Sequence, residues 1–265
     1  MASVRVEQPP ASLAALVRHV GVIGWSGLLT GVVVGGLGSR VFMRIAGATG
    51  RPAARGAGTE AGFRVGELTV GGTMALVVFV GIFAGIIGAL LYAIFRPWLS
   101  WAGRFRGLVF GVVLFAFGSA SSDVMNPDNV DFLILGNDLI NVVMIVALFL
   151  AFGVVIEEIH RALDRRVAPS GDRMRIGLVL FAATGALLSI PLTITTMFGD
   201  GCDCGPPIVA AWFTILAGVG TVLWWVSSRR GAARLPAQVL GYAGLIGTTA
   251  FGLVRAISDA AEIIG

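Results

Sequence analysis

Long apolar runs separated by short polar stretches constrain this chain more than any other feature of its sequence. A helix needs about 20 apolar residues to cross a bilayer core about 30 Å thick. The runs are continuous rather than alternating in polarity, which favours helices over a β-barrel. We therefore predict an all-α, polytopic transmembrane helix bundle of about seven spans. The spans are expected at roughly 17–40, 72–95, 105–122, 138–159, 175–198, 207–227 and 237–257.

The composition supports the same class of protein. Of the 265 residues, 56% are hydrophobic and 13% are charged, and the mean hydropathy is +0.89. A water-soluble domain of this length could not present that balance to solvent. All 19 basic residues are arginine, which excludes chemistry that needs a lysine amine. They are scattered around the spans, indicating a membrane interface and no nucleic-acid-binding surface. Residues 1–265 are expected to form a single integral membrane domain.

The distribution of arginine predicts the orientation, because arginines near span ends stay preferentially on the cytoplasmic side. The connections after the third and fifth spans contain aspartate and no arginine. We therefore expect a cytoplasmic N-terminus, an external C-terminus and a multi-pass location in the cell (inner) membrane. The arginines then placed on the cytoplasmic side are Arg5, Arg18, Arg96, Arg104, Arg106, Arg161, Arg165, Arg166, Arg173, Arg175, Arg229, Arg230 and Arg234.

The connection after the first span breaks this pattern. Arg40 and Arg44 are four residues apart and share one helix face, where two guanidinium groups can grip a phosphate or carboxylate at the outer headgroup level. Arg64 is a third candidate for the same anionic ligand. Alternatively, these side chains extend to lipid phosphates or pair with external aspartates. The arginines of this external connection are Arg40, Arg44, Arg51, Arg55 and Arg64.

The connection after the third span is dense in oxygen ligands. Asp123, Asp128 and Asp131 can hold a divalent cation, although their spacing does not match an EF-hand loop. The sequence Asn-Pro-Asp-Asn in the same connection is also a good turn. Asn137 or Asp138 can in addition cap the fourth span. Ligand binding and turn formation both remain open for these aspartates.

Cys202 and Cys204 are the only cysteines and lie two residues apart in the connection after the fifth span. Two thiolates there can bind a soft metal or cycle through a disulfide. A tetrahedral zinc site would need further ligands, but His19 and His160 are expected on the opposite side. A structural or inert thiol pair is the third interpretation. No cofactor is identified by these patterns.

Two further expectations concern the spans themselves. No Asp, Glu or His lies near a predicted midplane, which counts against a proton-coupled pump. Residues 157–161, Glu-Glu-Ile-His-Arg, end the fourth span and are interpreted as a solvated cytoplasmic helix end. Glycines at four-residue spacing are expected to let neighbouring helices approach closely. These glycines are Gly27, Gly31 and Gly35, then Gly81 and Gly85, and then Gly103, Gly107 and Gly111.

The leading hypothesis for function is a non-enzymatic membrane protein, because no nucleophile elbow, P-loop or dinucleotide motif is present. It would bind or transport a small anionic or lipid ligand, or serve as a scaffold for protein subunits, through the external Arg and Asp surface. The alternative is a membrane enzyme acting at the outer leaflet on a lipid headgroup or thiol. It would use the aspartates or the pair Cys202 and Cys204.

Overall fold

The computed structural model describes residues 12–50, 70–75, 77, 81–121, 123–128, 137–166, 208–230 and 234–265. Every regular element within these ranges is helical, as predicted, and none of them is a strand. The elements are α1 (Leu13–Thr30), the π-helix η1 (Gly31–Gly38), α2 (Ser39–Thr49), α3 (Val70–Ala75), α4 (Phe83–Phe95), the 3-10 helix η4 (Arg96–Phe105), α5 (Arg106–Ser121), the 3-10 turn η5 (Asp123–Met125), α7 (Asp138–Arg166), α9 (Ile208–Arg230) and α10 (Arg234–Ile264).

Five helical stretches in the described part of the chain are long and apolar enough to cross a membrane. Their outward faces are apolar, as in α10, where Val254 is 71% exposed and Ile246 is 64% exposed. Apolar side chains directed away from the core are expected where lipid is the solvent. The predicted fifth span, 175–198, lies outside the described residues. The five stretches are Ala14–Thr49, Phe83–Ser121, Asp138–Arg166, Val209–Ser227 and Leu235–Ile264.

The first of these stretches is longer than predicted. The helix continues through η1 and α2 to Thr49, beyond the expected span of 17–40, and it carries both Arg40 and Arg44. Arginine does not break a helix, and the chain leaves helical geometry only at Gly50, whose backbone is extended. At 1.5 Å per residue, 36 residues span about 54 Å, well beyond the thickness of an apolar layer.

The second stretch, Phe83–Ser121, reverses direction and forms two antiparallel legs, α4 and α5. Pro97 stands at the start of η4, and Gly103 adopts a positive φ of 53° that only glycine adopts readily. After the turn, the Phe110 ring packs on Tyr92 of α4, with 5.0 Å between ring centroids. The helix reversal therefore brings the third predicted apolar run back along the second.

Close glycine contacts confirm the expected helix packing. A Cβ atom on Gly27 would lie 2.5 Å from the Gly85 carbonyl oxygen, so α1 and α4 touch through their backbones. In the same way, a Cβ atom on Gly153 of α7 would lie 2.3 Å from the Gly107 carbonyl oxygen of α5. Gly103 is the exception to the predicted pattern, since it forms the turn and has nothing within 4 Å of its Cβ position.

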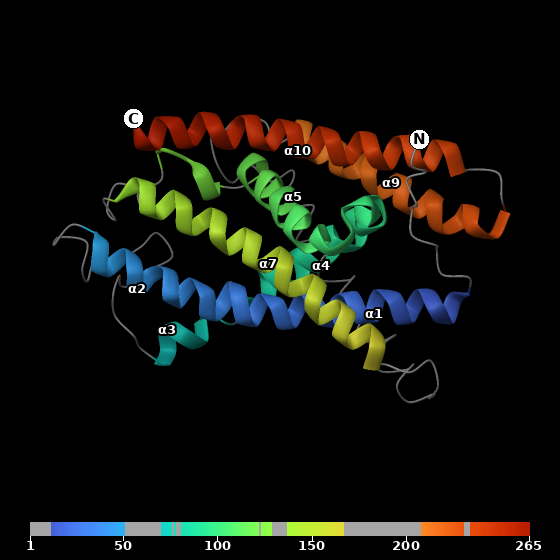
Figure 1. Ribbon diagram of the computed structural model, residues 1–265, viewed down its shortest axis with the longest axis horizontal. Helices are drawn as coiled ribbons and strands as arrows, with labels where there is room; N and C mark the ends of the chain where they lie inside the picture. Colours follow the sequence, from blue (N-terminus) through green and yellow to red (C-terminus); the bar gives the residue numbers. More distant parts are fainter. Residues whose placement is uncertain are drawn as a thin grey trace.

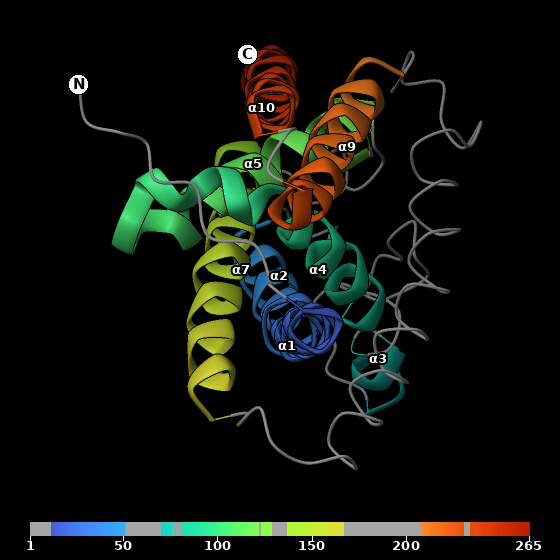
Figure 2. The same ribbon diagram turned by 90° about the vertical axis from the view of Figure 1, so that its right-hand side faces the viewer.

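The two ends of the bundle differ in charge (Figure 1). The start of α1, η4 and the end of α7 form one end, at the right of Figure 1, which we call the arginine-rich end. The end of α2 with Arg44, the start of α7 with Asp138 and the C-terminus of α10 with Glu262 lie at the opposite end. Figure 2 shows α9 and α10 packed side by side above α4 and α5. The arginine-rich end carries Arg18, Arg96, Arg104, Arg106, Arg161, Arg165 and Arg166.

Candidate functional site

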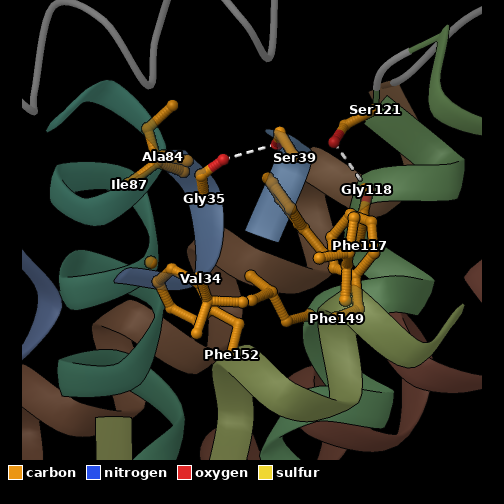
Figure 3. A pocket seen from close by; sticks show the side chains of 13 residues that line it. Val34, Gly35, Ser39, Ala84, Ile87, Phe117, Gly118, Ser121, Phe149 and Phe152 are labelled. Carbon is orange, nitrogen blue, oxygen red and sulfur yellow. Dashed lines mark hydrogen bonds between the residues drawn. The ribbon is translucent and has the colours of Figure 1, made fainter. Parts of the chain in front are cut away.

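A cavity of about 280 Å³ lies between four helical segments (Figure 3). Its walls come from η1 with the start of α2, from α4, from the second half of α5 and from the middle of α7. None of the described residues that line it is charged, and the wall that they form is almost entirely carbon. The lining residues are Val34, Gly35, Ser39, Ala84, Ile87, Gly88, Leu114, Phe117, Gly118, Ser121, Leu148, Phe149 and Phe152.

Local sequence explains the cavity. Glycine occurs four times in η1, where the backbone follows a π-helix, a widened turn that is frequent at functional sites. Small residues at Ala84 and Gly118 leave space, while aromatic rings close the sides. The Phe152 ring lies against the Gly88 backbone, since a Cβ there would be 2.5 Å from the ring. This arrangement combines a thin, small-residue wall with rigid aromatic surfaces.

The two hydroxyl groups of the cavity wall are directed to their own helices, as the dashed lines in Figure 3 show. Ser39 Oγ donates to the Gly35 carbonyl oxygen, and Ser121 Oγ donates to the Phe117 carbonyl oxygen at 2.6 Å. A hydroxyl satisfied by its own backbone presents little polarity to the space beside it. The cavity is therefore suited to an apolar guest.

The predicted arginine site is described in part. Arg40 directly follows the cavity residue Ser39 and is 8% exposed, whereas Arg44, one turn further along α2, is exposed. The two side chains thus share a helix but differ in their access to the surroundings. Arg64 lies outside the described residues.

The predicted aspartate and cysteine sites are described less completely. The backbone N–H of Asp128 donates to Asn126 Oδ1 at 3.0 Å, which confirms the predicted turn at this point. Asp123 lies in η5, and Asp138 begins α7, as predicted for the fourth span. Asp131, Cys202 and Cys204 lie outside the described residues. In the described ranges, no group of three or more His, Cys, Asp or Glu side chains is arranged to hold a metal ion.

A buried charged cluster lies at the arginine-rich end and corrects one prediction. Glu157 and His160 were expected at a solvated helix end, but each is only 2% exposed. The expectation is right for Glu158, whose side chain is 61% exposed. The physical reason is that α7 continues to Arg166 and packs there against α1 and α5, which cover part of its surface.

Glu157 is the centre of this cluster. Tyr92 of α4 donates its hydroxyl hydrogen to Glu157 Oε2, and Arg161 Nε donates to Oε1 at 2.7 Å. Arg106 Nη1 of α5 lies 3.8 Å from the same Oε1 atom. Arg96 Nε in turn donates to the Tyr92 hydroxyl at 3.1 Å. One carboxylate thus joins α4, α5 and α7 through charge-assisted contacts, which are the strong class of hydrogen bond.

Two histidines extend the cluster toward α1. The His160 ring lies 5.6 Å from the Tyr92 ring and 6.0 Å from the His19 ring, both edge-on. Its Nδ1 atom is buried and has no hydrogen-bond partner among the described residues. Nearby, Arg18 donates to Asp164 Oδ1 at 2.7 Å and so links α1 to the end of α7.

Sequence reasoning missed this cluster, although a signal was present. Glu157, His160 and Arg161 have the i, i+3, i+4 spacing that places them on one helix face. Tyr92 is one of only two tyrosines in the chain and lies at the end of an apolar run next to Arg96. A polar helix face that lies level with a tyrosine and an arginine of another span is typical of a buried polar network. Periodicity within one span does not show that two spans share such a level.

Comparison of the chain with protein-family models, with curated proteins and with solved structures finds no significant match. The class of protein is therefore inferred from the fold alone. Over the described ranges, the bundle is all-helical, has five helices long and apolar enough to cross a membrane, and exposes apolar outer faces, which are the features of a helical membrane protein.

Proposed function

We propose that this multi-pass membrane protein binds the apolar chain of a lipid-like ligand in the cavity between η1, α4, α5 and α7. The observation that carries the proposal is the cavity itself, about 280 Å³ in volume and lined by carbon. This volume lies near the lower end of the range for ligand pockets. Such a wall offers nothing to water or to an ion, whereas an acyl or isoprenoid chain gains van der Waals contact along its length.

The external arginines are proposed to hold the headgroup of that ligand. Arg40 and Arg44 follow the cavity residue Ser39 along the same helix, so a chain in the cavity would place an anionic headgroup at their level. Guanidinium groups favour phosphate and carboxylate groups through paired donors. Arg64 and the aspartates Asp123, Asp128 and Asp131 complete the external surface that we propose as the ligand entrance or as a contact for partner subunits.

Seven spans with a cytoplasmic N-terminus remain part of the proposal. Support comes from the direction of the described helices: α7 ends at the arginine-rich end, whereas α9 begins farther along the bundle and runs antiparallel to α10 toward that end. The connection 167–207 has to join these two points, and a span at 175–198 would do so. The excess of arginine at one end supports its assignment to the cytoplasm.

Orientation is tested with single cysteines in a Cys202→Ser, Cys204→Ser background. Asp128→Cys should react with a membrane-impermeant maleimide on intact cells, and Glu158→Cys should react only after permeabilisation. Both positions are exposed and lie at opposite ends of the bundle. The reverse labelling pattern would overturn the orientation.

Ligand binding is tested by native mass spectrometry of the full chain, extracted gently from its own membrane. We expect a bound lipid-like molecule that is lost in Ala84→Leu, because this side chain would fill the cavity. Ala93→Leu is the matched control and should retain the ligand. Ala93 is half-buried, as Ala84 is, but the helical repeat places it on the opposite face of α4. A bare wild-type chain, or equal retention in both variants, would refute the proposal.

A further inference from the structure

The charged cluster at the arginine-rich end contains more than a structural ion pair needs. Glu157 receives contacts from Tyr92, Arg106 and Arg161, and is itself 2% exposed. Arg96, which reaches the cluster through the Tyr92 hydroxyl, is 7% exposed. Burying a carboxylate and a guanidinium group within one cluster is costly, so the convergence of Glu157 and Arg96 with the partly exposed Arg106 and Arg161 calls for a functional reason.

Basic side chains also surround His160. Its ring lies 6.0 Å from the His19 ring and 5.6 Å from the Tyr92 ring, and the Tyr92 hydroxyl accepts a hydrogen bond from Arg96. The ring is 2% exposed, and its Nδ1 atom has no hydrogen-bond partner among the described residues. A buried polar atom of this kind is rare in native proteins and marks a place where a further polar group is expected.

The position of the cluster indicates the chemistry of that group. The cluster lies where α1, α4, α5 and α7 meet near one end of the apolar spans, and η4, which begins at Arg96, carries the exposed Trp101. Tryptophan is enriched at the level of lipid headgroups, and basic pockets between spans on the cytoplasmic side bind phosphate-bearing headgroups. Arginine forks and an imidazole together match the oxygens of a phosphate group.

We propose that this cluster is a second binding site, which takes a phosphate group at the arginine-rich end of the bundle. His160 Nδ1 and the guanidinium groups of Arg96 and Arg106 hold the phosphate oxygens, while Glu157 and Tyr92 orient these basic side chains. The phosphate is carried by an anionic lipid of the adjoining leaflet or is free in solution. The site lies at the other end of the bundle from Arg40 and Arg44 and does not depend on the cavity ligand.

The test is thermal unfolding of the detergent-solubilised full chain at matched ionic strength. The probes are phosphatidylglycerol, phosphatidylcholine and inorganic phosphate, because a ligand that binds only the folded state raises Tm with concentration. The main variant is His160→Phe, which keeps an aromatic ring against Tyr92 and removes the unpartnered nitrogen. Arg96→Lys keeps the charge and removes the planar fork. Arg104→Gln is the control, since Arg104 is exposed and stacks on Phe105.

We expect the half-saturating probe concentration to rise about tenfold or more in His160→Phe and severalfold in Arg96→Lys, with Arg104→Gln unchanged. Stabilisation by phosphatidylglycerol alone assigns the phosphate to a lipid, and stabilisation by inorganic phosphate assigns it to a free ion. A purely structural cluster predicts that His160→Phe responds to every probe as the wild type does. That result, or the absence of any stabilisation of the wild type, overturns the proposal.

Discussion

A hydrogen-bond chain through Trp98 allows the packing of the bundle to be tested quantitatively. Trp98 of η4 is fully buried, and its Nε1 donates to Thr221 Oγ1 of α9 at 2.9 Å. Thr221 Oγ1 donates in turn to the Ile94 carbonyl oxygen of α4 at 2.7 Å. The indole cannot move away, because Gly241 of α10 lies directly against it and a Cβ there would be 2.2 Å from the ring. Thr221→Val keeps the side-chain shape and removes both contacts.

The expected cost follows from the burial of the indole. A buried donor left without a partner costs about 1–3 kcal/mol. Hydrogen bonds between membrane helices average roughly 0.6 kcal/mol and reach about 1.7 kcal/mol. We therefore expect Thr221→Val to lower the free energy of unfolding by about 1–2 kcal/mol. In a double-mutant cycle with Trp98→Phe, the coupling energy should be about 0.6–1.7 kcal/mol.

The assay is unfolding of the purified chain in mixed micelles of increasing sodium dodecyl sulfate content, followed by circular dichroism. Thr249→Val is the matched control, because the Thr249 hydroxyl donates to the Leu245 carbonyl oxygen of its own helix at 2.7 Å. Its loss should change stability by less than about 0.5 kcal/mol. Equal effects of the two valine substitutions, or a coupling energy of zero, would refute the role of this hydrogen-bond chain.

Three further predictions use the same unfolding assay. Gly153→Ala should lower the free energy of unfolding by about 1–3 kcal/mol, because its Cβ atom would lie 2.3 Å from the α5 backbone. Gly218→Ala is the control and should be neutral or stabilising, because the nearest neighbour of its Cβ atom is 3.9 Å away. Equal effects of the two substitutions would contradict the helix contact. Glu157→Gln should lower the free energy of unfolding by about 1–3 kcal/mol, because it removes the charge that pairs with Arg161 and the partly buried Arg106 and weakens the hydrogen bond from the buried Tyr92; a neutral effect would show that the carboxylate is dispensable. Gly103→Ala should lower the free energy of unfolding by about 1–2 kcal/mol, because alanine is strained at the φ of 53° found there. An unchanged unfolding midpoint would argue against that turn.

Hydropathy was sufficient to predict the helical class, because a helix that crosses a bilayer must be apolar over the whole length that lies in the hydrocarbon layer. The same reasoning overlooked Glu157 and His160, since a charged residue at a span end looks solvated until a neighbouring helix covers it. Arg40 and Arg44 were expected on one helix face, and arginine is a good helix former, but nothing in the local sequence predicted that the helix would continue to Thr49.

The close helix approaches were predictable and the cavity was not. Gly31 and Gly81 are small, and small residues at four-residue spacing indicate where backbones can meet. The cavity depends on which small residues have no side chain of a neighbouring helix packed against them, as at the cavity side of Ala84. It also depends on where the Phe152 ring is placed. These facts depend on pairing between four segments distant in the sequence, which periodicity within one segment does not encode.

The cavity and the charged cluster are neighbours along the bundle axis, and one aromatic ring stands between them. Gly88 and Phe152 line the cavity, and Tyr92 and Glu157 of the cluster follow four and five residues later on the same two helices. One helical turn is only about 5.4 Å. Because the Phe152 ring lies against the Gly88 backbone, it closes the described bundle between the two sites.

This closure favours holding a ligand over conducting one. Proteoliposomes with the wild-type chain should therefore leak anions no faster than protein-free liposomes. Phe152→Ala removes the ring and should open the cavity toward the arginines of the cluster, so that anion leakage rises. Phe149→Ala is the control, since Phe149 lines the same cavity but packs on Phe115 and Gly118 instead of Gly88. If the two alanine variants leak equally, Phe152 is not the barrier, and rapid leakage through the wild type would mean that the bundle conducts.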